Sequence, residues 1–385
     1  MNTILKHIMP FGKILLLILF VLSVLQFFKV FTNTYYPDFS SYYYGPLAAF
    51  HGGNPYLGGK QFFTAFVYPP SVLLFFLPFT LLPFNAAERM FTVLSIVCLL
   101  FSFWLLFKLF NKTLYSITGV FLLTLLFNFF PEKFTLGMGQ INNVILLLEV
   151  GFIYCYFKKL DYLAGVFLAF AIALKLSPVL LLLYVVIDRR WKMLFSTLLV
   201  LLGIGFVVGL FVSPNLNIHF LTAVLPGILG SWKGDYYNQS LSGFLLRDVH
   251  SIFLQQLLRT GLGILFLIFS LMLLWKYHKK NDATDLLSLS ILITISLVIN
   301  TFSWQHHFVW LLIPLIVTFF YLTLRHFHLI YYIVLGVSFV LVAVNLRTPS
   351  TVPVILQSHV LYGALLLYGL DAYLLFKESP KNLIL

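Results

Sequence analysis

The sequence predicts an all-α polytopic membrane protein: a bundle of about twelve transmembrane helices, with juxtamembrane helices at its outer face. Of its 385 residues, 61% are apolar and 9% are charged, whereas a soluble globular chain carries about 25% charged residues. The mean hydropathy is +0.99. This number of charges is too small to cover the surface of a soluble protein of this size. Most of the chain must therefore face lipid or other apolar segments. A soluble enzyme, a disordered chain and a disulfide scaffold are excluded.

The N-terminal part is predicted in three pieces. The apolar run Lys13–Thr32 is long enough to cross about 30 Å of hydrocarbon, and it is typical of an uncleaved anchor with its N-terminus inside. Residues 33–66 are polar and form the first outer loop. Residues 67–84 contain four prolines, which favours a re-entrant or juxtamembrane hairpin over a span, because such a backbone needs protein partners.

The rest of the chain is nearly continuous apolar sequence, and it predicts one integral membrane domain over residues 1–385. A long outer loop covers residues 213–258, and C-terminal transmembrane helices cover residues 311–385. Beyond the anchor, the predicted spans are 86–108, 113–130, 140–157, 160–175, 178–191, 192–212, 259–275, 285–300, 307–323, 328–346 and 356–376.

The formal net charge of +12 is explained by membrane topology and lipid headgroups rather than by nucleic-acid binding. With this set of spans, fifteen of the 24 Lys and Arg residues lie inside. They include three basic clusters, Lys158-Lys159, Arg189–Lys192 and Lys276–Lys280. Counting residues 67–84 as a span would move these clusters outside, against the positive-inside rule.

The same topology gathers the polar connecting segments on the outer face. These segments are 33–66, 131–140, 175–178, 213–258 and 303–307. The predicted inner loops are short and basic, as plain connectors are. A polar collection on one side predicts a site that faces the outer leaflet.

Asp38 is the first candidate, because it is the only acid among the first 87 residues and lies just after the anchor. A carboxylate at the boundary between water and lipid can act as a general base towards a hydroxyl. The alternative is a helix cap or turn before a helix at 39–50. Tyr68, before two prolines, is a further candidate, although it can simply mark a helix start.

Lys175 interrupts an apolar stretch, and Pro178 breaks the helix three residues later. A lysine at that depth is costly unless it faces a cavity or a partner, so the break is a candidate anion site; snorkelling to the surface is the alternative. Gln140 and Asn142 form a polar patch at the start of another span, where they act either in a site or as interhelical hydrogen-bonding groups.

Two outer segments supply the remaining candidates. Arg247 offers bidentate hydrogen bonds to phosphate, or it anchors its loop to headgroups; Asn238 and Gln239 precede it in the same loop. The segment 303–307 contains Trp304, His306 and His307. Adjacent histidines point to different faces of a helix and are poor joint metal ligands, so no metal is predicted. A histidine that pairs with Asp38 or a phosphate oxygen is the functional alternative to a residue of an interfacial aromatic belt.

Taken in order, these motifs resemble glycosyltransferase family 87, a family of membrane mannosyltransferases with the GT-C fold. The resemblance covers residues from about 33 to 310. The motifs are Tyr36-Pro37-Asp38-Phe39, Gly53-Asn54-Pro55-Tyr56, Tyr68-Pro69-Pro70, Gly139-Gln140-x-Asn142, Gly165 with Lys175-x-x-Pro178, Arg189-Arg190, Asn238-Gln239-Ser240, Arg247 and Trp304-x-His306.

The resemblance implies a bacterial or archaeal enzyme of the inner or plasma membrane, with its active site on the outer face. It implies inverting transfer of a hexose, mannose above all, from a polyprenyl-phosphate donor to a glycolipid or glycan, with no cofactor, metal or nucleotide. Asp38 is implied as the general base and His306 as its partner near the donor phosphate, although His307 could fill that role. Lys175 and Arg247 are implied as phosphate contacts.

Three other functions remain open. A transporter or flippase of lipid-linked sugars also has broken helices and outer polar groups, but it should show an internal repeat and polar groups at mid-membrane. A lipid-linked ligase or polymerase of the same fold is indistinguishable by sequence. An accessory membrane subunit fits the composition, but gives no reason for polar motifs to collect on one face. The sequence therefore predicts a polyprenyl-phosphate-sugar-dependent glycosyltransferase.

Overall fold

The structure is a computed structural model that describes residues 2–33, 36–230, 234–346 and 351–377. Residues 231–233 of the predicted outer loop, and residues 347–350 and 378–385 of the C-terminal segment, lie outside the described residues. Within the described part, the chain folds into helices with one isolated β-bridge, between Asn238 and Trp304. The all-α prediction is therefore confirmed.

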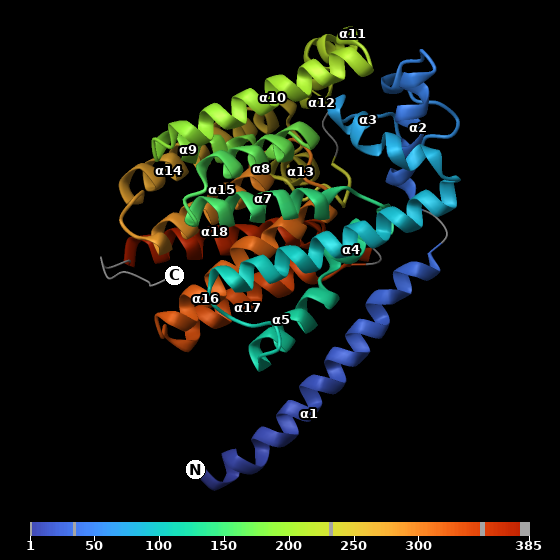
Figure 1. Cartoon of the computed structure of the whole chain (residues 1–385). Helices are drawn as coiled ribbons and strands as arrows, with labels where there is room; N and C mark the ends of the chain where they lie inside the picture. The colour runs from blue at the N-terminus through green and yellow to red at the C-terminus, as the bar shows by residue number, and fades with distance from the viewer. Residues whose placement is uncertain (1, 34–35, 231–233, 347–350, 378–385) are drawn as a thin grey trace.

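The helices follow one another through short connections (Figure 1). Their bounds are α1 Asn2–Phe27, α2 Pro37–Phe50, α3 Ser71–Phe76, α4 Phe84–Leu109, α5 Ile117–Asn128, α6 Phe130–Met138, α7 Asn142–Phe157, α8 Asp161–Leu174, the 3-10 helix η4 Ser177–Leu180, α9 Leu181–Ile187, α10 Trp191–Phe211, α11 Pro214–His219, α12 Leu225–Gly230, α13 Leu241–Asp248, α14 Ile252–Tyr277, α15 Asp282–Ile299, the 3-10 helix η6 Gln305–Leu311, α16 Leu312–Leu324, α17 Leu329–Ala343 and α18 His359–Lys377.

The prediction of twelve spans is wrong. Among the described residues, seven helices are long and apolar enough to cross a membrane, or eight if the pair α5 and α6, bent by 53° at Phe129, is one span. The runs 140–157, 160–175, 178–191 and 328–346 instead fold into apolar helices of 10–17 residues. Their hydrophobicity has another cause: α7, for example, is buried along most of its length by neighbouring helices, and burial inside a protein demands the same apolar residues as lipid does.

The hairpin prediction is compatible with the structure but not tested by it. The segment 67–84 holds α3 and a following 3-10 turn, and the apolar helix Ser71–Leu81 that they form is among those too short to span. The side of the membrane on which it lies stays a prediction.

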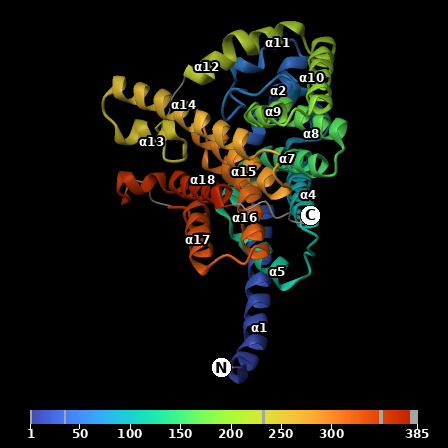
Figure 2. The same cartoon turned by 90° about the vertical axis from the view of Figure 1, so that its left-hand side faces the viewer.

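The helix α1 leaves the bundle, whose interior holds α7, packed against α4 and α8, and α15, packed against α14, α16 and α18. Both views show α1 running away from the main body (Figures 1 and 2), where it packs mainly against α5. Only 11% of its most apolar window is buried by protein. The helix α8 lies between α7 and α10. These arrangements define a multi-pass membrane protein whose first helix is mostly uncovered by the rest of the described chain.

Close contact between α8 and α10 depends on a small residue. A Cβ added to Gly165 would lie 2.5 Å from the carbonyl oxygen of Met193 and 2.8 Å from Cβ of Ser196. The Ser196 hydroxyl donates to the Tyr162 carbonyl at 2.8 Å. Small residues and hydroxyl hydrogen bonds of this kind hold membrane helices together, and here they fix the position of Lys175, which follows α8.

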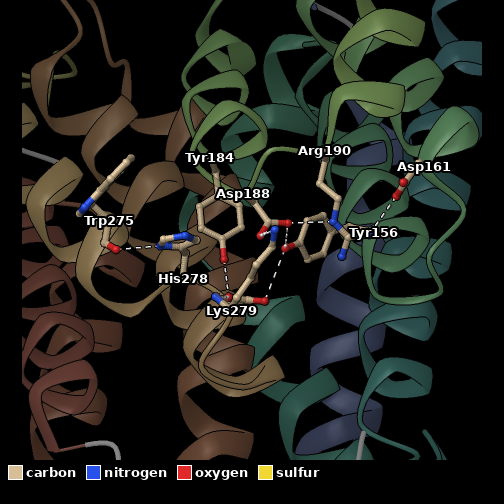
Figure 3. Close-up of polar contacts among 9 residues, drawn as sticks. Tyr156, Asp161, Tyr184, Asp188, Arg190, Trp275, His278 and Lys279 are labelled. Carbon is tan, nitrogen blue, oxygen red and sulfur yellow. Dashed lines mark hydrogen bonds and ion pairs between the residues drawn. The ribbon is translucent and has the colours of Figure 1, made fainter.

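The three basic clusters that the sequence places on one face do lie at one end of the bundle. Asp188, at the end of α9, is fully buried. It accepts hydrogen bonds from Tyr156 at 2.7 Å and from Arg190 at 2.8 Å, and pairs with Lys279 at 3.3 Å. Figure 3 shows Tyr156 of α7, Asp188 and Arg190 of the connection between α9 and α10, and Lys279 of the connection between α14 and α15 converging. Arg190 also binds Asp161 at 3.0 Å. Asp161 begins α8 and Lys175 follows its last residue, so the two lie about 21 Å apart along the helix. This cluster is therefore structural and distant from the candidate site.

Replacing Asp188 by alanine is expected to destabilise the protein by about 2–3 kcal/mol. Removing one partner of a buried ion pair costs about 3–5 kcal/mol, but Lys279 is 54% exposed and Arg190 keeps Asp161, so water and Asp161 offset part of the loss. The measurement is thermal unfolding in detergent. Asp161→Ala, which removes a partly exposed partner of the same arginine, is the matched control and should lower the Tm much less. Equal effects of the two changes would contradict a structural role centred on Asp188.

Candidate functional site

Asp38 lies in the first turn of α2, and its carboxylate is held by an amide from a distant helix connection. Gln140 donates from Nε2 to Oδ2 of Asp38 at 2.6 Å and to the Tyr68 hydroxyl at 3.1 Å. The Tyr42 hydroxyl in turn donates to Oε1 of Gln140 at 2.7 Å. All four residues are buried or half-buried. Two tyrosines therefore fix the orientation of the amide that presents one hydrogen to the carboxylate.

The alternative of a helix cap does not describe Asp38. The N-cap position belongs to Tyr36, which makes no side-chain cap hydrogen bond. The position of Asp38 near the positive end of the α2 dipole still favours its charged form. Its carboxylate is engaged by a side chain 102 residues away, which is expected of a site residue more than of a local turn residue.

The connection between α6 and α7 brings Gln140 to Asp38 through a glycine. Gly139 ends α6 with φ of 68°, a left-handed conformation that other residues adopt at a cost. A Cβ at this position would lie 2.7 Å from Cβ of Phe39, the neighbour of Asp38. The glycine thus permits both the turn and the close approach of α2.

Lys175 lies at the break between α8 and the 3-10 helix η4. It contacts the connection between α6 and α7 through Asn142, whereas Asp38 contacts this connection through Gln140. Its ammonium donates to Oδ1 of Asn142 at 2.9 Å and lies 4.8 Å from the centre of the Trp310 ring. The indole of Trp310 donates to the carbonyl oxygen of Asn142 at 3.1 Å. Gln140 and Asn142 are two residues apart. The same short segment therefore presents the Gln140 amide to Asp38 and the Asn142 amide to Lys175.

Asp38 and Lys175 are close enough for their charges to act on each other. Burial raises the pKa of Asp38 to about 6, and the hydrogen bond from Gln140 and the charge of Lys175 oppose that rise. Burial lowers the pKa of Lys175, which lies outside the candidate spans, to about 7, while the charges of Asp38 and Glu149 oppose the fall. Near neutral pH Asp38 is therefore mostly ionised and able to take a proton, and Lys175 is close to the midpoint of its titration, where an anionic group would favour its charged form.

The two histidines lie beside Lys175 rather than against Asp38. The ring of His307 stacks on Trp310, with centroids 5.7 Å apart and planes at 5°, and the ring of His306 packs edge-on against Phe134. The carbonyl oxygen of His306 accepts hydrogen bonds from Thr135 and Asn142. Neither ring nitrogen of His306 has a hydrogen-bond partner among the described residues. His306 thus presents unused polar atoms near the cation.

Sequence reasoning missed several residues of this group. Glu149 is 2% exposed within α7, and its charge acts on Lys175. It is a lone acid in an apolar run, so the reasoning that found Lys175 could have found it. Trp310 and Tyr42 carry no comparable signal, because aromatic residues are common throughout this sequence.

Four predicted site residues, Arg247, Asn238, Gln239 and Trp304, lie in a different group, and the binding roles predicted for them stay predictions. Arg247 donates to the carbonyl oxygens of Asp235 at 2.8 Å and Asn238 at 2.9 Å, and to the Ser358 hydroxyl at 2.8 Å. A guanidinium engaged in this way braces the connection before α13 against Ser358, while its Nε has no hydrogen-bond partner among the described residues.

The other three residues of this group also hold backbone together. The Asn238 carboxamide oxygen accepts from the amides of Ser240 and Ser303. Gln239 binds the Gln357 carbonyl and the Val360 amide. Trp304 bridges to Asn238 through the backbone and stacks its ring parallel to Phe302. Asn238 and Gln239 are fully buried. These residues join the loop to the segment that carries His306 and His307.

The fold and the site together define a class: a multi-pass helical membrane protein with a buried carboxylate and a lysine on either side of one helix connection. The chain belongs to glycosyltransferase family 87, whose model matches residues 66–301. The resemblance seen in the sequence is thereby confirmed.

Curated relatives fall into two groups. The chain is 31% identical over 229 residues to an alpha-(1->3)-arabinofuranosyltransferase of Mycobacterium tuberculosis (strain CDC 1551 / Oshkosh), covering 56% of this chain and 50% of the relative. It is 25% identical over 323 residues to a polyprenol-phosphate-mannose-dependent alpha-(1-2)-phosphatidylinositol mannoside mannosyltransferase of Mycobacterium tuberculosis (strain ATCC 25618 / H37Rv), covering 74% of this chain and 70% of that relative. The chain spans about half the length of the arabinofuranosyltransferase it matches.

Proposed function

We propose that this protein is a glycosyltransferase that uses a polyprenyl-phosphate sugar and glycosylates a glycolipid or glycan at the outer face of a bacterial cell membrane. The observation that carries the proposal is the placement of Asp38 and Lys175 on either side of the 140–142 segment, within reach of each other's charge. Family membership supports the reaction class, and the two groups of relatives leave mannose and arabinofuranose as the candidate sugars.

The chemistry needs a base and a cation at separate points. An acceptor hydroxyl transfers its proton to the carboxylate of Asp38 while its oxygen bonds to the anomeric carbon of the donor. The bond from that carbon to the phosphate oxygen breaks with inversion, and polyprenyl phosphate leaves with the bonding electrons. Lys175 stabilises the charge that grows on the phosphate. The ring nitrogens of His306, which have no hydrogen-bond partner in the described part of the chain, supply further contacts to the same group.

An apolar groove beside Lys175 supports a lipid-linked donor. It is a pocket of about 520 Å³ between α3, α8 and α10, and its lining includes Leu174, the residue before Lys175. The Ser71 hydroxyl donates to the Ala173 carbonyl and holds α3 against α8. Because the lining reaches the residue before Lys175, we infer a donor with an anionic head at Lys175 and a hydrocarbon tail in this groove.

The pH dependence of transfer is expected to follow Asp38. A general base must be ionised, so kcat/KM should fall about tenfold for each pH unit below about 6, where Asp38 takes up a proton. Gln140→Leu removes a hydrogen bond to the ionised form, so the pKa of Asp38 rises and this acid limb should move to higher pH. A pH–rate profile of both proteins is the measurement. An acid limb that stays in place would contradict the assignment of Asp38 as base.

The proposal is tested with purified protein in liposomes that contain polyprenyl-phosphate mannose or polyprenyl-phosphate arabinofuranose. With an octyl glycoside acceptor, one donor should yield polyprenyl phosphate and an extended glycoside in equal amounts, which also identifies the sugar. Consumption of neither donor would overturn the proposal. Movement of the intact lipid-linked sugar across the bilayer without transfer would indicate the alternative, a transporter or flippase.

A further inference from the structure

A second pocket, separate from the apolar groove, opens beside the C-terminal end of α2. Its volume is about 430 Å³, and it lies between the turn 52–54 and the connection from α10 to α11. The polar side chains in its wall are Asn54, Ser213, Asn215 and His219, next to aliphatic Val212 and Leu216. The described residues of the lining include no Lys, Arg, Asp or Glu. Such a wall suits a neutral, hydroxyl-rich ligand better than a phosphate or a charged headgroup.

The pocket is built on the same framework as the catalytic carboxylate. The Asn54 side chain accepts from the Tyr56 amide at 3.0 Å, and the Tyr56 ring packs against His219 with centroids 5.7 Å apart. The Tyr56 hydroxyl donates to the carbonyl oxygen of Tyr68 at 3.0 Å, and Tyr68 shares the Gln140 amide with Asp38. A ligand in the pocket would therefore be held in fixed relation to Asp38.

The pocket is too far from Asp38 to hold the reacting sugar. Asp38 and Ala49 lie in the first and last turns of α2, which places them about 16 Å apart along the helix. Gly165 of α8 lies against Met193 and Ser196 of α10. Lys175 is ten residues after Gly165, so it lies beside about residue 205 of α10 if the two helices run in parallel. Val212 lies about two turns beyond residue 205, just after the end of α10, and Asn215 follows in α11. A ligand that reaches both points must be longer than a single sugar.

We propose that this pocket binds a sugar unit of the acceptor other than the one that is glycosylated, so that the protein extends an existing glycan. This inference rests on the proposed function and specifies its acceptor class: a short oligosaccharide or a glycolipid with several sugars. The distal sugar lies against Asn215, Ser213 and His219, and the reacting hydroxyl lies at Asp38.

The test uses synthetic octyl glycosides that carry from one to four sugars. In the wild-type protein, the acceptor KM is expected to fall by about tenfold or more from the shortest to the longest, with a similar kcat. Asn215→Ala combined with His219→Ala should abolish that gain and leave the KM of the one-sugar glycoside unchanged. Ile218→Ala, on the same helix but outside the lining, is the matched control and should keep the full gain. A wild-type KM that does not depend on length, or variants that lose activity equally on all acceptors, would overturn the pocket assignment.

Binding without donor separates this inference from the proposed function. Calorimetry with the four-sugar glycoside is expected to show binding that the paired Asn215 and His219 substitutions weaken by about tenfold. Binding of this kind without any transfer would mean that the proposed reaction is wrong while the pocket assignment stands. If transfer occurs but substitution of Asn215 and His219 does not weaken binding, the proposed reaction stands and the pocket assignment is wrong.

Discussion

Asp38→Asn is expected to lower the rate of transfer by about 10²–10⁴-fold, the contribution usual for a general base. Asparagine has nearly the same shape and can still accept the hydrogen bond that Gln140 donates at 2.6 Å. It cannot accept the proton of the acceptor hydroxyl. The protein should therefore fold and bind donor as before, and turnover should be lost. The measurement is transfer in membranes supplied with radiolabelled donor, at matched amounts of protein.

The matched control for this change is Asp235→Asn. Asp235 is an exposed carboxylate in the connection before α13, and its substitution should leave turnover near the wild-type value. Wild-type turnover of the Asp38→Asn protein would show that the base lies elsewhere. A loss of folded protein in the Asp38→Asn variant, seen in gel filtration, would show that the carboxylate supports the fold.

Lys175→Gln should have the next largest effect, a loss of about 10²–10³-fold in kcat, because a fixed donor to developing charge contributes that much. Glutamine keeps a hydrogen-bond donor for Oδ1 of Asn142, now 2.9 Å from the ammonium, but carries no charge for the departing phosphate. Lys175→Arg keeps the charge and should retain part of the rate. Initial rates at varied donor concentration give kcat and KM for each protein.

Lys133→Gln provides the comparison for Lys175. Lys133 belongs to α6 and its ammonium lies 3.4 Å from Oδ1 of Asn128, away from the site, so its loss should change kcat little. An equal loss in the two glutamine variants would indicate a general effect of positive charge at this end of the bundle. A Lys175→Gln protein with normal kcat would exclude Lys175 from contact with the leaving group.

The two charged residues of the candidate site can be predicted from the sequence because charge is rare in this chain. Asp38 and Lys175 stand alone in apolar or aromatic surroundings, so solvation alone does not explain them. Gln140 and Asn142 were found as a polar patch, and the structure shows that each amide binds one of these two charges. The order of motifs along the chain was enough to predict the family.

The remainder depends on packing between distant segments, which a local pattern does not encode. Arg247 is the residue type expected of a phosphate contact, but in the fold its guanidinium donates to the connection before α13 and to Ser358, which precedes α18. Trp310 contacts Lys175 because the 3-10 helix η6 packs against the break after α8, and its ring centre lies 4.8 Å from the Lys175 ammonium. The number of spans was overestimated because α7, α8, α9 and α17 are as apolar as a span but too short.

A structure of the Asp38→Asn protein with bound polyprenyl-phosphate sugar tests the central claim most directly. The account predicts a phosphate oxygen within hydrogen-bond distance of Lys175 Nζ and a hydrocarbon tail in the groove between α3, α8 and α10. It also predicts an anomeric carbon that faces position 38. A phosphate bound at Arg247, or a tail that lies away from this groove, would contradict it.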